Sequence, residues 1–424
     1  MNSSAHQPVA LPSCEEGTLS GKRVLFVVND PAFFVSHRVN VASGARRLGA
    51  EVFVATPPGP AMQEIERLGF RHTPIELDRW SSSPQKELLA VRALVRCYRA
   101  LRPDLVHHVT IKPVIYGSWA ARIAGVSAVV NAVPGVGQVF TSRGARSAAR
   151  RMLVKALYRT ATRHPNAAFI FQNPDDRAYF ENQGLLGKCR ARLIRGAGVS
   201  LGEFQPSIEP ELPVLIILPS RMLVGKGIRE FVEAASLLRL RARNGSCPQM
   251  RFALVGPTAE GNPSGLKRSE IEAWARSGIV EYWGERSDMP TVLSTSHIVC
   301  LPSFYGEGIP KVLIEAAASG RPVITTDTPG CREIVRDGVN GVLVAPRDVE
   351  ALTNAIEMLS RDRELRVQMG MEGRAIVEKE GFSDDAVVRD TMTLYHEVMK
   401  LPSSLQPNMG LENPRNGRFL GDAF

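Results

Sequence analysis

Short apolar runs alternate with longer amphipathic stretches along most of this 424-residue chain. Short runs of this kind are typical of buried strands, and the longer stretches are typical of helices that cover a sheet. In the first half, strands are expected at 23–28, 51–56, 105–108, 128–131 and 167–171. In the second half, they are expected at 214–218, 251–255, 279–282, 298–301 and 323–326. The alternation predicts an α/β fold with parallel, doubly wound sheets.

A Pro-rich segment at 205–213 interrupts this alternation, which then restarts. The pattern therefore predicts two Rossmann-like domains, at 21–200 and 201–383, with a ligand cleft where their strand ends face each other. A last helical stretch at 384–400 is expected to pack back on the first domain. The segments 1–20 and 401–424 are expected to be disordered tails.

The net charge of +9 is spread unevenly. Residues 1–200 hold 27 Lys and Arg against 13 Asp and Glu, whereas the remainder holds 25 against 30. A basic half suggests an anionic partner, either a diphosphate, anionic lipid or nucleic acid. Only 6% of residues are aromatic and no nucleic-acid module is recognisable, so we expect no nucleic-acid partner.

Other features bear on cellular location. The six cysteines are scattered without the spacing of a metal site or a disulfide framework, which is typical of a reducing compartment. The apolar runs are too short to span a bilayer, and the first 20 residues lack the pattern of a signal peptide. We therefore expect a cytoplasmic protein.

Two glutamates, Glu307 and Glu315, are the strongest chemical signal. Glu307 stands between Gly306 and Gly308 in an expected loop, and Glu315 follows on the helix that begins after Pro310. Free N–H groups at a helix start favour a phosphate or a hydroxyl-rich ligand. The alternative interpretation is that Glu307 caps the helix and Glu315 is a solvated residue on it.

Further candidates follow other expected strands. Arg221 and Lys226 lie on a glycine-containing loop after the strand at 214–218, and two such cations suit a diphosphate. The alternative is that Arg221 and Lys226 are ordinary cations of a surface loop. Gly256 and Trp283 end two more strands, where backbone groups or an aromatic ring could contact a base.

These motifs, with the apparent hairpin at 337–346 and the junction at 196–206, resemble glycosyltransferase family 4, retaining enzymes of the GT-B fold. The resemblance implies that Arg221 and Lys226 clamp the donor diphosphate, and that Glu307 contacts the sugar hydroxyls. Glu315 would contact the ribose. It also implies donor contacts by Gly306, Gly308, Ile309 and Pro310, and catalysis without a metal or other cofactor.

Three segments of the first half resemble a subgroup that adds a hexose or N-acetylhexosamine to lipid-diphosphate-linked sugars. They lie at 33–38, 107–117 and 131–140. The implied acceptor-binding residues are His37, Arg38, Lys112, Asn131, Gly135 and Gly137. His108 is the implied catalytic histidine, because Val109 occupies the position where many family members carry their second histidine. Strand alternation lets at most one of His107 and His108 face the cleft.

A basic stripe at 143–163 recurs at helical spacing with apolar residues between the cations. This pattern favours binding to the inner, anionic surface of the plasma membrane, whereas a shorter stripe at 92–102 favours a solvated face.

The expected function is transfer of a sugar from a UDP-sugar to a lipid-linked saccharide in cell-surface polysaccharide or glycan biosynthesis. The alternatives are a sugar-nucleotide epimerase of the GT-B fold and a glycosyltransferase with a soluble acceptor. A nicotinamide oxidoreductase is disfavoured, because no Gly-x-Gly-x-x-Gly follows the first strand.

Overall fold

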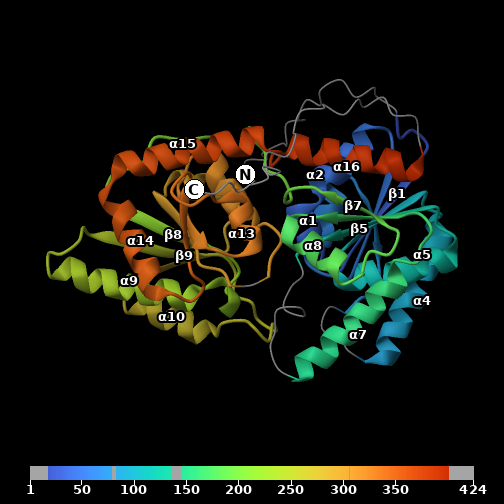
Figure 1. The fold of residues 1–424 in the computed structure, drawn as a ribbon, viewed down its shortest axis with the longest axis horizontal. Coiled ribbons are helices and arrows are strands. Elements are labelled where there is room, and N and C mark those ends of the chain that lie inside the picture. The colour runs from blue at the N-terminus through green and yellow to red at the C-terminus, as the bar shows by residue number, and fades with distance from the viewer. Residues whose placement is uncertain (1–17, 79–82, 136–144, 305, 401–424) are drawn as a thin grey trace, which may run out of the picture.

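The computed structural model describes residues 18–78, 83–135, 145–304 and 306–400. They form two α/β domains side by side, each built on a parallel sheet with helices on both faces (Figure 1). This confirms the expected fold class. Most of the two expected tails lies outside the described residues. Leu19, which falls within the first expected tail, is however fully buried, and its N–H donates to the Leu48 carbonyl at 2.8 Å.

The amino-terminal domain has a seven-stranded sheet in the order β3-β2-β1-β4-β5-β6-β7. Its strands are β1 (Arg23–Val28), β2 (Glu51–Thr56), β3 (Arg71–Pro74), β4 (Leu105–Val109), β5 (Ala128–Val133), β6 (Ala167–Phe171) and β7 (Arg190–Leu193). Its helices are α1 (Pro31–His37), α2 (Val39–Arg47), α3 (Met62–Arg67), α4 (Pro84–Leu101), η1 (Pro113–Gly117), α5 (Ser118–Ala124), α7 (Ala145–Ala161) and α8 (Pro174–Asn182). The central strands β4, β5 and β6 are buried along their whole length because helices cover both faces.

Two helices, α1 and α2, follow β1 and meet at Arg38. Asp30 caps α1 by accepting from the N–H groups of Ala32 and Phe33. Arg38 leaves helical geometry, with φ −134°, and its side chain is only 4% exposed. The break therefore turns this guanidinium into the protein.

The carboxy-terminal domain has a six-stranded sheet in the order β10-β9-β8-β11-β12-β13. Its strands are β8 (Val214–Pro219), β9 (Met250–Val255), β10 (Glu281–Gly284), β11 (Ile298–Leu301), β12 (Val323–Thr326) and β13 (Gly341–Val344). Its helices are η2 (Val224–Lys226), α9 (Ile228–Arg243), α10 (Arg268–Arg276), α11 (Met289–Ser294), α12 (Lys311–Ala318), α13 (Pro329–Ile334), α14 (Val349–Arg361) and α15 (Arg363–Lys379). The hairpin expected at 337–346 is wrong, because β13 pairs parallel with β12.

The chain crosses between the domains twice, and the two crossings contact each other. Val199 donates to the Phe382 carbonyl at 3.1 Å, and Asp384 donates back to the Val199 carbonyl at 2.9 Å. After the second crossing, α16 (Asp384–Met399) lies against the amino-terminal domain (Figure 1). Tyr395 and its apolar neighbours on α16 belong to the same buried cluster as the β1 residues.

Candidate active site

Lys226 and Glu307 meet at the carboxyl edge of the second sheet. Lys226 is the last residue of η2, the first helix after β8, and Glu307 lies in the loop that follows β11. The Lys226 ammonium is 2.5 Å from one Glu307 oxygen, and the Ser303 hydroxyl donates to the other at 2.7 Å. Both side chains of the pair are less than a fifth exposed. Arg221 lies on the same loop as Lys226 and is exposed.

Glu315 is buried on α12, where a neighbouring lysine neutralises it. The Lys311 ammonium lies 3.1 Å from a Glu315 oxygen, one helical turn away. Burial lowers the pKa of Lys311, but attraction to Glu315, Asp384 and Glu203 outweighs it and leaves the pKa raised. Sequence reasoning missed Lys311, although its spacing from Glu315 is that of a helical ion pair.

His37 approaches this cation cluster from the amino-terminal domain. It is half-buried, its ring stacks on Phe33 with centroids 4.1 Å apart, and Nδ1 lies 2.7 Å from the Ser36 hydroxyl. Burial lowers the pKa of His37 well below its usual value. Four nearby cations lower this pKa further; in decreasing order of effect they are Lys311, Arg38, Arg221 and Lys226. His37 is therefore a neutral imidazole within electrostatic reach of the predicted diphosphate clamp.

Arg38 is placed differently from His37. Its guanidinium donates to the His37 carbonyl at 2.9 Å, and burial lowers its pKa to about 10. Because Arg38 is buried, it supports His37 and offers no surface to an acceptor in this conformation.

His107, His108 and Asn131 lie inside the first domain. His108 has no exposed surface, and its ring nitrogens lie 2.9 Å from the Tyr98 hydroxyl and 2.8 Å from the Asn131 amide oxygen. Burial lowers the pKa of His108 to about 4. His107 is 2% exposed and contacts the Tyr395 hydroxyl at 2.6 Å. Helices cover both faces of β4, so neither histidine is exposed, and we leave His108, the implied catalytic histidine, and Asn131 out of the proposed machinery.

The three remaining residues that were expected to bind the acceptor differ in their surroundings. The Lys112 ammonium lies 2.7 Å from a Glu87 oxygen and donates to the Asp78 carbonyl at 2.6 Å. Lys112 is thus engaged by α4 and the segment before it. Gly135 lies against the Glu307 loop of the other domain. Gly137 lies outside the described residues.

Gly256 and Trp283 lie at the carboxyl ends of two neighbouring strands of the second sheet, β9 and β10. The Gly256 N–H donates to the Gly284 carbonyl at 2.7 Å, and its own carbonyl accepts from the Tyr282 hydroxyl at 3.1 Å. Trp283 is half-buried on the edge strand β10, and its indole N–H donates to Glu281 at 2.9 Å. Both residues lie at strand ends on the edge where α/β sheets bind ligands.

The donor-loop candidates are brought together between the domains. Gly306 is half-buried, whereas Gly308, Ile309 and Pro310 are buried. Pro310 precedes the first turn of α12, so the loop enters the helix that carries Glu315. The structure thus joins both glutamates to one loop-and-helix segment.

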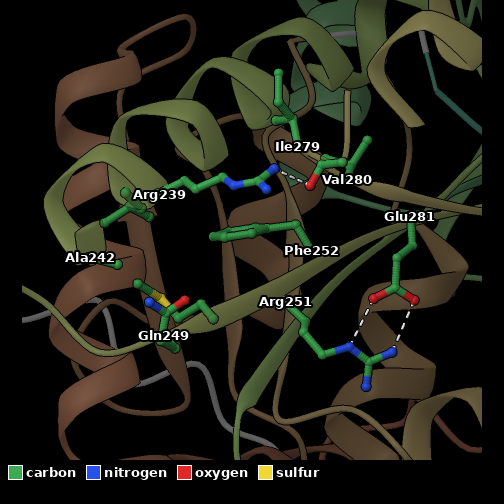
Figure 2. Close-up of a pocket in the computed structure, with 11 residues that line it drawn as sticks. Arg239, Ala242, Gln249, Arg251, Phe252, Ile279, Val280 and Glu281 are labelled. Carbon is green, nitrogen blue, oxygen red and sulfur yellow. Dashed lines mark hydrogen bonds and ion pairs between the residues drawn. The ribbon is translucent and has the colours of Figure 1, made fainter. Parts of the chain in front are cut away.

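A pocket of about 180 Å³ lies on the opposite edge of the second sheet (Figure 2). Arg239, Arg251, Phe252 and Glu281 are among its lining residues. Arg251 and Glu281 satisfy each other through two hydrogen bonds of 2.8 and 2.9 Å, and Arg239 donates to the Gly278 carbonyl. Because it adjoins the first residues of β9 and β10, this pocket is separate from the Lys226–Glu307 edge.

A glycosyltransferase of the GT-B type is the class that fits this arrangement. Two facing α/β domains carry a cationic loop and a carboxylate loop at the strand ends of the second sheet. Family models describe residues 23–167 as "Glycosyl transferase 4-like" and residues 213–362 as "Glycosyl transferases group 1". The chain belongs to this glycosyltransferase family.

Relatives and solved structures agree with this membership. The chain is 26% identical to the N,N'-diacetylbacillosaminyl-diphospho-undecaprenol alpha-1,3-N-acetylgalactosaminyltransferase of Campylobacter jejuni, over 89% of this chain and 99% of the relative. It is also 26% identical to the UDP-Gal:alpha-D-GlcNAc-diphosphoundecaprenol alpha-1,3-galactosyltransferase of Escherichia coli, over 65% of this chain and 72% of the relative.

Among solved structures, sucrose-phosphate synthase from Thermosynechococcus elongatus matches with a TM-score of 0.74 at 22% identity, covering 89% of this chain and 99% of that one. HepE of Anabaena in complex with UDP-glucose matches with a TM-score of 0.71 at 19% identity, covering 88% and 99%. At these identities the two structures support the fold alone.

Proposed function

We propose that this glycosyltransferase moves a sugar from a UDP-sugar to a lipid-diphosphate-linked saccharide, with retention at the anomeric carbon. The observation that carries the proposal is the Lys226–Glu307 pair, which places a cation and a carboxylate side by side at the ligand edge of the second domain. The names of the Campylobacter and Escherichia relatives support the acceptor class, because both contain a diphospho-undecaprenol-linked sugar.

Each charged group of the site has a distinct task in this proposal. Lys226 and Arg221 offset the negative charge that grows on the diphosphate as the glycosidic bond breaks. Glu307 accepts hydrogen bonds from the sugar hydroxyls, since a carboxylate offers several acceptor positions. Glu315 takes the ribose hydroxyls and lies 3.1 Å from the Lys311 ammonium.

The acceptor hydroxyl attacks the face of the sugar from which the diphosphate departs. A diphosphate oxygen takes the hydroxyl proton, so no side-chain base is required. His37 lies on the acceptor side of the cleft within electrostatic reach of the clamp, and is neutral. It orients the acceptor hydroxyl through a hydrogen bond. The reaction needs no metal in this scheme, and the described residues contain no group of three or more His, Cys, Asp or Glu suited to a metal.

The acceptor's lipid calls for contact with an anionic membrane surface, and α7 supplies the matching side chains. Met152 and Leu153 are 73% and 60% exposed on α7, next to Arg150 and Arg151. Exposed apolar residues flanked by arginines favour the interface of an anionic bilayer. Within the described ranges, no helix has the length and hydropathy to cross a bilayer, so the proposed contact is peripheral.

Leu88 and Leu89 on α4 extend this surface. They are 51% and 50% exposed, and α4 packs, as α7 does, on η1 (Figure 1). We include these leucines in the proposed membrane contact, while the shorter stripe at 92–102 stays predicted to be a solvated face.

A panel of UDP-sugars assayed against undecaprenyl-diphosphate-linked saccharides tests the function. The expected result is one preferred donor and an α-linked product from an α-linked donor, read by NMR of the anomeric proton. Incubation of each UDP-sugar without acceptor tests the epimerase alternative, which requires isomerisation of the donor. Transfer to a free sugar but not to a lipid-linked one would establish the soluble-acceptor alternative.

A further inference from the structure

The backbone of the Glu307 loop is hydrogen-bonded to the opposite domain. The Gly308 N–H donates to the Pro134 carbonyl at 2.8 Å, and the Ile309 N–H donates to the Gln172 side-chain oxygen at 2.9 Å. Pro134 follows β5 and Gln172 follows β6, so both acceptors belong to the amino-terminal domain. Two consecutive amides of the donor loop are thus satisfied from across the cleft.

Three glycines bring the backbones together at this contact. A Cβ on Gly135 would lie 2.5 Å from the Gly308 nitrogen, and a Cβ on Gly330 would lie 1.5 Å from the Gly308 oxygen. Only glycine allows main chains to approach this closely. The donor loop is therefore clamped between α13 of its own domain and the acceptor domain.

Gln172 and Ile309 are 4% and 5% exposed, so water does not replace this bond in the observed arrangement. A buried amide that loses its acceptor is strongly destabilised, which makes the Gln172 oxygen a requirement for this loop conformation. Asn173 is fully buried beside it, with its amide 3.5 Å from the Gly308 carbonyl, and caps α8 by accepting from the Asp176 N–H. The cap fixes the start of α8 directly after Gln172.

We propose that Gln172 is a positioning residue that makes the placement of Glu307 depend on contact between the two domains. The inference rests on the proposed function and goes beyond it. Ile309 lies between Glu307 and the α12 segment that carries Glu315. When the domains separate, Gly308 and Ile309 lose their acceptors and the carboxylate loop relaxes. The donor site is then complete only while the acceptor domain is docked, which limits transfer of the sugar to water.

Gln172→Met and Gln172→Glu separate this role from simple packing. Methionine has a similar size but cannot accept the Ile309 N–H, whereas glutamate keeps an oxygen at the same position. Gln249→Met is the matched control, because Gln249 is exposed and lines the distant pocket. Each variant is measured for residue-resolved amide hydrogen exchange, for kcat and donor KM, and for the Tm.

Gln172→Met is expected to raise exchange at the Ile309 amide at least tenfold and to lower kcat at least tenfold. Gln172→Glu is expected to restore most of the protection of the Ile309 amide and most of kcat. Gln249→Met is expected to match the wild type in both measurements. Wild-type exchange and kcat in Gln172→Met would overturn the proposal, as would equal losses of kcat and Tm in both Gln172 variants. If the wild type transferred no sugar to any acceptor, the proposed function would fail, while the exchange data would still decide the role of Gln172.

Discussion

Lys226 and Glu307, which are 81 residues apart in the sequence, form an ion pair with an N–O distance of 2.5 Å. Ser303 holds the second Glu307 oxygen, so the carboxylate is fixed at both ends. A donor diphosphate carries more negative charge than one carboxylate and competes for the same ammonium. Lys226 can therefore turn from Glu307 to the diphosphate and free the carboxylate for sugar hydroxyls in the same step.

Removing either charge of this pair is expected to abolish most of the transfer. Glu307→Gln keeps the shape and an oxygen for Ser303 but loses the charge, and Lys226→Ala loses the ammonium. We expect kcat to fall by about 100-fold or more, the scale for losing one preorganised electrostatic contact. Steady-state kinetics measure the loss, and circular dichroism checks the fold. Lys379→Ala, at an exposed site on α15, is the control; wild-type turnover in either site variant would refute the assignment.

Donor binding is expected to involve uptake of a proton by His37. The pKa of this imidazole is held low first by burial and then by Lys311, Arg38, Arg221 and Lys226. A bound diphosphate offsets part of that positive charge and raises the pKa. Because the complex then holds more protons than the free protein, donor affinity should increase as the pH falls through the pKa that His37 has in the complex.

Calorimetry with a UDP-sugar, whose diphosphate does not titrate in this range, measures the proton uptake in buffers of different ionisation enthalpy. His37→Gln should bind the donor with a flatter pH dependence. An unchanged pH dependence in this variant would show that another group takes up the proton.

Acid should destabilise the amino-terminal domain through His108. The pKa of this buried imidazole is depressed to about 4, so the unfolded chain binds a proton more readily than the folded one. The stability is fully present above the unfolded pKa of about 6.5 and is lost as the pH falls toward 4, with a total of about 3 kcal/mol. Chemical denaturation at several pH values measures this slope. His108→Gln should reduce it by a similar amount, and an unaltered slope would contradict the buried, neutral state of His108.

Binding to anionic vesicles should depend on the exposed apolar pair of α7. Met152→Ser combined with Leu153→Ser is expected to weaken sedimentation with phosphatidylglycerol-containing vesicles several-fold, because buried apolar area is lost. Met371→Ser on α15 is the matched control, since Met371 is 69% exposed on the other domain. Added salt should weaken wild-type binding by screening the arginines. Equal binding by the double variant and the control would remove α7 from the membrane contact.

The strongly apolar strands and their alternation with helices were predictable from the sequence, but the two edge strands of the first sheet were not. The strand β3 (Arg71–Pro74) and the strand β7 (Arg190–Leu193) are short and carry polar, partly exposed side chains, so no apolar run marks them. The helix break at Arg38 has no glycine or proline to announce it. It depends on tertiary burial of the guanidinium, which local patterns do not encode.

The candidate site shows a similar division. Glu307 and Lys226 were both chosen from loop position and charge, and the structure brings them together. His108 was implied by the family resemblance. Because helices cover both faces of β4, residues on either face of this strand are buried, and strand alternation could not show whether His108 faces a ligand. Gln172 gave no local signal at all, because its role exists only once Ile309 of the other domain is placed against it.

The packing of α16 has a consequence for biosynthesis. Met392, Tyr395 and Val398 complete the buried cluster that begins with β1, so the first domain of the chain lacks part of its core until its last helix has left the ribosome. Domains normally acquire their structure in order during translation. Here the first domain can complete its core only once α16 has been synthesised, and loss of residues 384–399 would damage this first domain rather than the second domain to which they are adjacent in sequence.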